Sequence, residues 1–349
     1  MSWSRDRDPF GLPFHLSSDP LLRHGAPHRG GQSWMVGIER WSEAEERKLG
    51  LAVVGPTQCF ATPAPPFPKA LEQIELTEAD LLHFVGRDTP KNAIQAGIFK
   101  ALVLASTKLW FLSINTSALR ISHFLAQCYA ESGGFSEIEE SLNYREAAIR
   151  TKFSNRGLTE EQIKRLAWKP PADRHKDIQT AFGPAKTDEQ KTALAAKIKE
   201  SDDAQQSLRE EFANRIYSDK GKKDLGNGSV ESGDGYKFRG RGIKQITGRW
   251  NYTTAGKSPI VNQPLDSNPD LVATDFSVAV ATAVWYWDFF KLNQYADLDD
   301  AVKMTQAVNL GSGAVGKPVK KDSDFEKTVE TRKKLTDAAK AIWVEGKKA

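Results

Sequence analysis

The sequence is poor in cysteine and has no clustered histidines. Only two cysteines, Cys59 and Cys128, occur in its 349 residues. Two cysteines are too few for a disulfide scaffold or a structural zinc site. The six histidines show no metal-ligand spacing such as HExxH. We therefore expect a protein that needs no metal and no cofactor.

Long apolar runs and a strong net charge are also missing. No run of about 18 apolar residues occurs, so no membrane-spanning helix is predicted. The N-terminal stretch MSWSRDRDPF mixes charges and precedes no apolar block, unlike a Sec-type signal peptide. The 49 basic and 45 acidic residues give a net charge of only +4, which argues against a dedicated nucleic-acid binder. We expect neither a membrane nor a nucleic acid as partner, and synthesis in the cytoplasm without a Sec signal.

Proline is distributed unevenly and divides the chain. Nine of the 17 prolines precede residue 70, and four of these lie in the run ATPAPPFPK. Proline fixes φ and removes an amide donor, so this run is typical of an extended linker. The sequence therefore predicts an N-terminal extension with a linker over residues 1–75 and a folded domain over residues 76–349.

Helical spacing of apolar residues dominates from Leu76 onward. It predicts helices that begin near Thr77 and that cover residues 94–106, 121–130, 277–290 and 325–342. Residues 159–215 are rich in Ala, Lys, Glu and Gln and predict two exposed helices, with breaks near Pro170 and Gly183. Residues 220–242 are rich in glycine, which predicts loop and short strand. The expected fold class is mainly α with a little β structure.

Glu131 is the first candidate for chemistry. It ends the apolar helix predicted over residues 121–130 and directly precedes Ser132-Gly133-Gly134. Desolvation and the negative end of a helix both raise the pKa of a carboxyl group. We therefore expect Glu131 to be protonated, as a general acid must be. A solvated glutamate at a helix end is the plain alternative.

Glu140 is the second candidate. On one continuous helix, nine residues would separate it from Glu131 by about 13.5 Å, but the two glycines let the chain fold back. Two carboxyl groups about 6.5–9.5 Å apart across a cleft leave room for a water, as in inverting glycosidases. Glu137 and Glu139 lie nearby, and the pattern does not choose among them. A solvated acidic loop is the alternative.

A glycine-rich segment, GDGYKFRGRGIKQITGRWNY at residues 233–252, carries aromatic, amide, hydroxyl and guanidinium groups. Aromatic faces stack on sugar rings and amides bond sugar hydroxyls, so the mixture favours a polysaccharide groove. Neither of the phosphate-loop patterns, GxxxxGK[ST] and GxGxxG, is satisfied. Arg239 and Arg241 are predicted to bind a carboxylate, or to pair with Glu131 or Glu140 instead. A structural glycine-rich hairpin is the remaining alternative.

Three ordered motifs resemble those of glycoside hydrolase family 19. Residues 124–135, followed by Glu140, Asn143 and Tyr144, are similar to its FLAQ…HESGGF…E…NY stretch. The glycine-rich segment resembles the family's GDGxxYRGRGxxQxTGxxNY signature. Residues 308–311 (VNLG) resemble its NGG segment. The resemblance covers roughly residues 76–345.

This resemblance implies a lysozyme-like α-helical fold with a small β-hairpin lobe. It implies inverting hydrolysis of β-1,4-linked N-acetylhexosamine polymers, with Glu131 as general acid and Glu140 as general base. The matched positions also imply that Gln245, Thr247, Asn251 and, more loosely, Asn309 hold the water and the substrate. The predicted substrate-binding set comprises these four residues and four others, namely Tyr144, Tyr236, Arg239 and Arg241.

The chain departs from the family pattern at three places. Ala130 stands where the family usually has histidine, and Leu310 replaces the first glycine of NGG. Residues 155–210 are longer than in compact members and are predicted to be a helical insertion. Residues 1–75 match no cell-wall-binding repeat.

We predict a peptidoglycan hydrolase of the lysozyme type, because the ESGGF and GDGYKFRGRG forms are closer to the family's endolysins than to its plant chitinases. A chitinase is the alternative, and a non-catalytic glycan-binding protein is the alternative of another class. The enzyme would reach the cell wall by phage holin-type lysis or as a secreted antibacterial effector. The expected partners are peptidoglycan glycan strands, with a cognate immunity protein and a component of the secretion apparatus for an effector.

Overall fold

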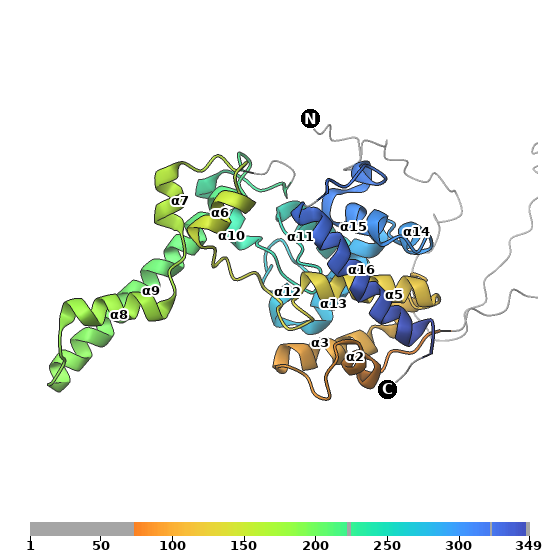
Figure 1. The fold of residues 1–349 in the computed structure, drawn as a ribbon, viewed down its shortest axis with the longest axis horizontal. Coiled ribbons are helices and arrows are strands. Elements are labelled where there is room, and N and C mark those ends of the chain that lie inside the picture. The colour runs from red at the N-terminus through yellow and green to blue at the C-terminus, as the bar shows by residue number, and fades with distance from the viewer. Residues whose placement is uncertain (1–72, 222–224, 322, 347–349) are drawn as a thin grey trace, which may run out of the picture. The chain divides into compact units, whose positions relative to one another are not determined.

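The computed structural model describes residues 73–221, 225–321 and 323–346, and these residues are mainly helical (Figure 1). Residues Gln73–Ala349 form one compact unit. The mainly α fold class is therefore confirmed, whereas the predicted extension and linker lie outside the described residues, apart from residues 73–75.

The helices of the first half of the described chain are α2 (Glu78–Phe84), α3 (Ala93–Leu104), α4 (Ser106–Phe111), α5 (Ala118–Glu131), α6 (Glu146–Lys152), α7 (Glu160–Leu166), α8 (Pro171–Phe182) and α9 (Asp188–Ile216). Later ones are η3 (Val230–Ser232), α10 (Asp234–Lys237), α11 (Arg249–Lys257), α12 (Leu271–Thr274), α13 (Phe276–Phe289), α14 (Asn293–Ala296), α15 (Ala301–Leu310), η4 (Ser312–Ala314) and α16 (Asp324–Trp343).

The predicted helices are present. The helix expected near Thr77 is α2, whose first turn is capped by the Thr77 hydroxyl, which accepts from the Asp80 amide at 3.0 Å. Residues 121–130 fall within α5, 277–290 largely within α13, and 325–342 within α16. Apolar periodicity predicted these elements because each buries one face or, for α13, nearly its whole surface.

The main core is built around α5, α13 and α16. Helix α16 packs along α5, and α13 packs on α3. Phe124 of α5 is fully buried and meets Trp287 of α13 edge to face, with ring centroids 5.4 Å apart. This core places the C-terminal end of α5, and so Glu131, on a rigid support.

A second, smaller core joins α6, α7 and the last turns of α9. Phe153, Phe212 and Ile216 are among its buried members. Phe153 and Phe212 contact edge to face at 5.3 Å. This cluster supports the loop that carries Glu140 and the C-terminal end of α9.

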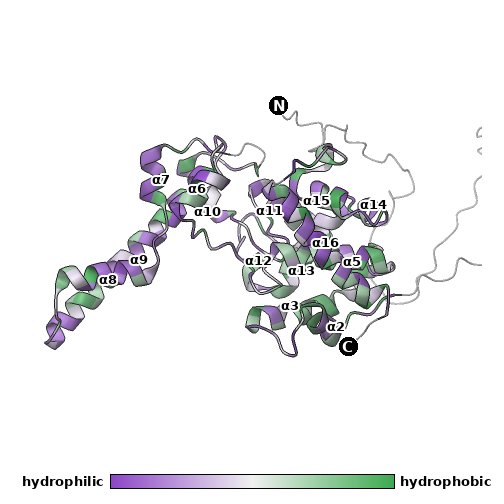
Figure 2. Ribbon diagram, in the orientation of Figure 1, coloured by the Kyte–Doolittle hydropathy of each residue, from purple (hydrophilic) through white to green (hydrophobic). Residues whose placement is uncertain are grey.

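The region predicted as two exposed helices contains three, namely α7, α8 and α9. Helix α7 ends at Leu166, Pro170 is the N-cap of α8, and Gly183 ends α8. Helix α8 packs against the first half of α9 (Figure 1), and no residue of α8 is buried. Hydrophilic and hydrophobic residues alternate along both helices (Figure 2). Asp202 ties the pair together by contacts with Arg174 at 2.8 Å and His175 at 3.0 Å. We call residues 170–204 the arm.

The expected β-hairpin is reduced to two isolated bridges within the described residues, Glu139 with Arg241 and Arg241 with Ile246. The glycine-rich segment instead contains the short helix α10 and the start of α11. Isolated backbone hydrogen bonds stand in place of the ladder of a β-sheet. For example, the Gly242 amide donates to the Ile138 carbonyl at 2.8 Å. The predicted short strand is therefore wrong, because positive φ at Gly233, Gly242 and Gly248 breaks the extended path.

No helix among the described residues combines the length and apolarity that a bilayer crossing requires.

Candidate active site

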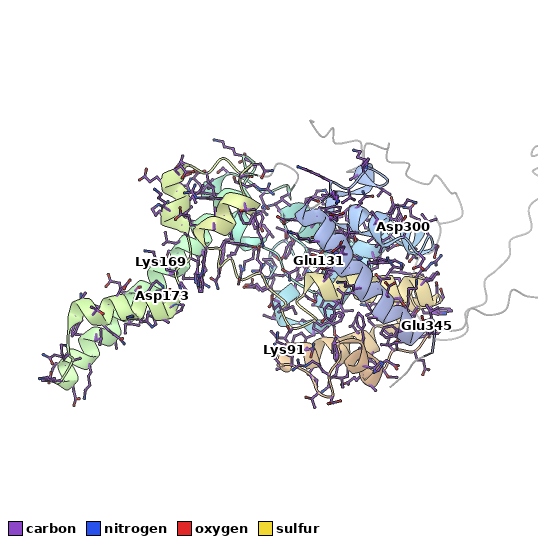
Figure 3. All side chains as sticks on the ribbon, in the orientation of Figure 1. Lys91, Glu131, Lys169, Asp173, Asp300 and Glu345 are labelled. Carbon is purple, nitrogen blue, oxygen red and sulfur yellow. The ribbon has the colours of Figure 1, made fainter. Side chains whose placement is uncertain are left out.

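The turn after α5 fixes the position of Glu131. Gly133 and Gly134 have φ of 54° and 72°, the left-handed region that favours glycine. The Gly134 amide donates to the Tyr129 carbonyl at 2.9 Å, and Gln95 of α3 donates to the Gly134 carbonyl at 2.6 Å. Figure 3 shows Glu131 at the end of α5 beside α16. The predicted end of this helix at the glycine pair is confirmed.

Glu131 is mostly buried and is held by two cations. Its Oε1 accepts a hydrogen bond from Arg332 of α16 and lies 3.5 Å from the Nζ of Lys244. Burial alone would raise the pKa of Glu131, but the charges of Lys244 and Arg332 outweigh it and lower the pKa below the ordinary value. The expectation of a raised pKa is therefore wrong, because the two cations come from distant parts of the sequence.

Lys244 is buried in the same place. Its Nζ lies 4.5 Å above the ring centroid of Tyr286, a cation–π distance. Burial lowers the pKa of Lys244, while the Glu131 carboxylate opposes that shift. The nearby Cys128 thiol is buried too, and its pKa rises to about 12 for that reason. Glu131 therefore belongs to a compact charged cluster enclosed by apolar groups.

Glu140 receives two hydrogen bonds, one on each oxygen. The Gly240 amide donates to Oε1 at 2.6 Å, and the Tyr217 hydroxyl donates to Oε2 at 2.9 Å. Burial raises the pKa of Glu140 and outweighs these two bonds, which lower it. Of its acidic neighbours, Glu137 is exposed and Glu139 is paired with arginines. Glu140 is thus the one half-buried carboxyl of the three that forms no ion pair among the described residues.

The glycine-rich segment approaches Glu140 closely. A Cβ at Gly240 would lie 3.0 Å from the Oε1 of Gln245 and 3.4 Å from the Glu140 carboxyl group, so a side chain here would push one of these groups aside. The Gln245 amide donates to the Gly242 carbonyl at 2.9 Å, and Asn251 donates to the Thr247 carbonyl at 2.7 Å. The structure thus brings Gln245 beside Glu140 and links Asn251 to Thr247. Whether these side chains hold substrate stays a prediction.

Arg241 is not placed to bind substrate. Its side chain is 1% exposed and is bonded to Glu139 at 2.8 Å and Asp270 at 2.6 Å. Arg239 also pairs with Glu139, at 2.8 Å. Neither arginine pairs with Glu131 or Glu140. The prediction of a substrate-binding Arg241 is wrong, because the bridge beside Glu139 turns its guanidinium into the protein.

The remaining predicted residues differ in their surroundings. The Tyr236 hydroxyl accepts a bond from Gln206 of α9 at 2.8 Å, and the Arg239 guanidinium covers its ring at 4.0 Å. Tyr144 packs on Phe153 at 4.9 Å in the smaller core. Asn309 is exposed near the end of α15, and no described residue hydrogen-bonds its side chain. The structure therefore gives Tyr144 a packing role and leaves Asn309 apart from the two glutamates' contacts.

Three residues of the site were missed from the sequence: Tyr217, Lys244 and Arg332. Lys244 lies inside the GRGIKQITG string, where a charged residue between Ile243 and Gln245 was a signal that could have been used. Arg332 sits in an amphipathic helix rich in Lys and Arg, so no pattern marks it. Among the described residues, no group of His, Cys, Asp and Glu side chains could hold a metal ion.

Comparison with known proteins shows the family of this chain. The family model for class I chitinases, glycosyl hydrolase family 19, matches residues 213–301, which include Tyr217, Gly240 and Lys244. A glycosyl hydrolase family 19 domain-containing protein of Haemophilus influenzae is 34% identical over 192 residues, which cover 55% of this chain and 71% of that protein. The chain belongs to glycosyl hydrolase family 19.

Other relatives of this family 19 protein match over shorter stretches. An acidic endochitinase of Petunia hybrida is 51% identical over 57 residues, 16% of this chain and 21% of the plant protein. An acidic 27 kDa endochitinase of Solanum lycopersicum is 51% identical over 53 residues, 15% of this chain and 21% of that enzyme. The crystal structure of a chitinase C mutant aligns with 78% of this chain and 94% of its own, with a TM-score of 0.41 and 16% identity.

Family membership makes the protein a glycoside hydrolase of the EC 3.2.1 class. Its two half-buried glutamates come from different supports, Glu131 from the end of α5 on the main core and Glu140 from a loop beside the smaller core. Hydrolysis of a glycosidic bond by two carboxyl groups needs this kind of pair, one to donate a proton and one to activate water.

Proposed function

We propose that this family 19 hydrolase cleaves the β-1,4 bonds of peptidoglycan glycan strands by an inverting mechanism. The observation that carries the proposal is the pair of half-buried glutamates with different electrostatic surroundings. Glu131 donates a proton to the leaving oxygen, and Glu140 removes a proton from the attacking water. The forms ESGGF and GDGYKFRGRG, which are closer to the family's endolysins, support peptidoglycan as the substrate.

The protonation states of Glu131 and Glu140 set a condition on this mechanism. Glu131 must be protonated and Glu140 ionised in the productive form, whereas the free enzyme favours the reverse, since the pKa is lowered at Glu131 and raised at Glu140. The productive form is then a minority, and its population is greatest between the two pKa values. Both cations contact Oε1 of Glu131, and no described residue bonds its Oε2. We assign proton donation to Oε2.

Chitin is the second candidate substrate. The 51% identity to the Petunia endochitinase, although it spans only 57 residues, favours it. A non-catalytic glycan-binding role is the candidate of another class, and the pair of half-buried glutamates argues against it.

Mass spectrometry of digestion products tests the proposal. Purified peptidoglycan and colloidal chitin are incubated with the wild type and with Glu131→Gln. We expect the wild type to release saccharides with new reducing ends from peptidoglycan, and Glu131→Gln to lose at least a hundredfold in rate, since general acid catalysis contributes about 10²–10⁴-fold. Glu137→Gln, an exposed neighbour, is the matched control and should keep full activity.

The two substrates give distinct outcomes. Products from chitin alone would assign the chitinase function instead. Binding of either glycan without any release of reducing ends would favour the non-catalytic alternative. An equal loss in Glu137→Gln would show that Glu131 has no special role. NMR of the first anomer released checks the inversion.

In the same proposal, the enzyme acts on the wall in the periplasm of a target or host cell, delivered as a secreted effector or by holin-type lysis. Residues 1–75 would load an effector onto its secretion apparatus, and a cognate immunity protein would block the site. Loss of binding to the apparatus on deletion of residues 1–60 supports the effector route, and unchanged binding contradicts it.

A further inference from the structure

Arg209 of α9 is a half-buried arginine whose charge is not matched by a carboxylate among the described residues. Its Nη2 donates to the amide oxygen of Gln206, and its Nη1 lies 3.4 Å from the amide oxygen of Asn143. Its Nε is buried and has no hydrogen-bond partner in the described part of the chain. By contrast, Arg239 and Arg332 each contact a glutamate.

Two neutral amides hold this guanidinium in place without neutralising it. Asn143 and Gln206 offer oxygen acceptors that carry no net charge. A partly buried cation with only neutral partners keeps most of its attraction for an anion, because the surrounding protein screens less than water does. The arrangement therefore fixes the orientation of the Arg209 fork and leaves its positive charge available.

The position of Arg209 connects it to the Glu140 side of the site. Asn143 lies three residues after Glu140 in the chain, and Gln206 also donates to the hydroxyl of Tyr236 at 2.8 Å. Tyr217, which bonds Glu140, is the C-cap of the helix that carries Arg209. Tyr217 follows Arg209 by eight positions, which correspond to about 12 Å along the helix axis. A short stretch of glycan chain spans such a distance.

The ligand that fits this charge is a carboxylate. Guanidinium groups bind carboxylates through two parallel hydrogen bonds, which a neutral sugar hydroxyl does not reproduce. Every second sugar of peptidoglycan carries a lactyl ether that ends in a carboxyl group, free or extended by a peptide with further carboxylates, whereas chitin carries none. We propose that Arg209 binds a carboxylate of the muramic acid side groups, near Glu140. This assignment rests on the proposed peptidoglycan function.

The proposal also explains which arginine can discriminate between the two glycans. Arg239 and Arg241 were the sequence-based candidates for this task, but Glu139 already occupies both. Discrimination then depends on a residue that the helix of the insertion contributes. A family member without this part of α9 would lack the contact.

Steady-state kinetics on two soluble substrates test the inference. One is glycan strands stripped of their peptides, with a free lactyl carboxylate on each muramic acid. The other is neutral N-acetylglucosamine oligomers. For Arg209→Gln we expect KM for the strands to rise about 10- to 100-fold, the range of a lost charge-assisted hydrogen bond. kcat on the strands and KM on the neutral oligomers should stay within about twofold of the wild-type values, because the lost contact is with a side group that takes no part in bond cleavage and that the oligomers lack.

Three controls accompany this variant. Arg209→Lys keeps the charge and should recover part of the loss. Arg165→Gln, which removes only an exposed pair with Glu211, should leave both KM values unchanged. Methyl esters of the lactyl groups should make the wild type behave like Arg209→Gln. A KM that rises equally on both substrates, or not at all, would overturn the proposal and leave Arg209 a structural residue.

A binding measurement separates failure of this inference from failure of the proposed function. Affinity for the strands is measured by calorimetry in Glu131→Gln and in the double variant with Arg209→Gln. If the wild type does not cleave the strands but Glu131→Gln binds them in an Arg209-dependent way, the peptidoglycan function is wrong and the carboxylate site stands. If the strands are cleaved but Arg209→Gln leaves the affinity for the strands unchanged, the function stands and this inference is wrong.

Discussion

At the scale of single residues, the pKa values of Glu131 and Glu140 are shifted in opposite directions although burial raises both. Burial acts on both carboxyl groups. Glu131 has Lys244 and Arg332 beside it, and their charges reverse the effect. At Glu140, the Gly240 amide, the Tyr217 hydroxyl and the charges of Arg239 and Arg241 all lower the pKa, but burial outweighs them. The two carboxyl groups thereby acquire different proton affinities, in the order opposite to their proposed roles as acid and base.

The pH dependence of hydrolysis follows from these shifts. The productive form has Glu131 protonated and Glu140 ionised, so the rate rises up to the pKa of Glu131, stays level, and falls above the pKa of Glu140. Since the two values straddle the ordinary glutamate value, we expect the optimum to lie below neutral pH. A plot of kcat/KM against pH, measured on soluble glycan strands, checks this. An optimum above neutral pH would contradict it.

Lys244→Met provides a sharper test at the same scale. Methionine keeps the length of the side chain and removes the positive charge near Glu131, so the pKa of Glu131 rises. The acid limb of the pH–rate profile should move to higher pH and the rate at the optimum should increase, while the alkaline limb, set by Glu140, stays in place. Lys197→Met, on the exposed surface of the arm, is the control. Movement of the alkaline limb alone would contradict the assignment of the two glutamates.

At the scale of elements, the arm contributes little to the stability of the fold. No residue of α8 is buried, and the buried residues of α9 begin at Gln205. The capping box of Thr187 and Gln190, with the contacts of Asp202, supplies local stability instead. Such contacts between exposed groups contribute only about 0–1 kcal/mol each.

Shortening the arm tests this division. Replacing residues 176–200 by a short Gly/Asn loop should leave the free energy of unfolding and the rate on soluble glycan within experimental error. Phe212→Ala, which opens a cavity in the smaller core, should cost about 3–5 kcal/mol. Urea unfolding followed by circular dichroism measures both. A large loss from the shortened arm would show that the arm supports the smaller core.

At the scale of the whole molecule, residues 73–349 contain the complete set of described cores. The main core joins Leu76 of the first segment to Trp343 of the last helix. Because the start and end of this segment meet in one core, it should fold without the residues before it. We expect a fragment of residues 73–349 to unfold cooperatively and to keep the kcat of the full chain on soluble strands. A fragment that is unfolded by circular dichroism would show that the N-terminal region takes part in the fold.

The sequence by itself determined the helices and the family, and it predicted the two glutamates as acid and base. Apolar periodicity predicted α5, α13 and α16, because each must bury a continuous face, and the order of the ESGGF and GDGYKFRGRG motifs pointed to the family. It also placed the end of α5 at the glycine pair, where only a left-handed turn lets the chain reverse. These features are local, so residues close in the chain are enough to predict them.

Only the tertiary structure decided the electrostatics of the site. The pKa of Glu131 depends on the charges of Lys244 and Arg332. Arg241 is unavailable to substrate because it pairs with Glu139 and Asp270. Arg209 keeps its charge because its partners, Asn143 and Gln206, are neutral. Most of these partners lie far away along the chain. Where a partner is close in sequence, as Gln206 is to Arg209, several neighbouring polar side chains could have taken its place, and only the fold determines which one does. Charge interactions act through space over a few ångströms, so their sign at a given carboxyl group is set only when the chain has folded.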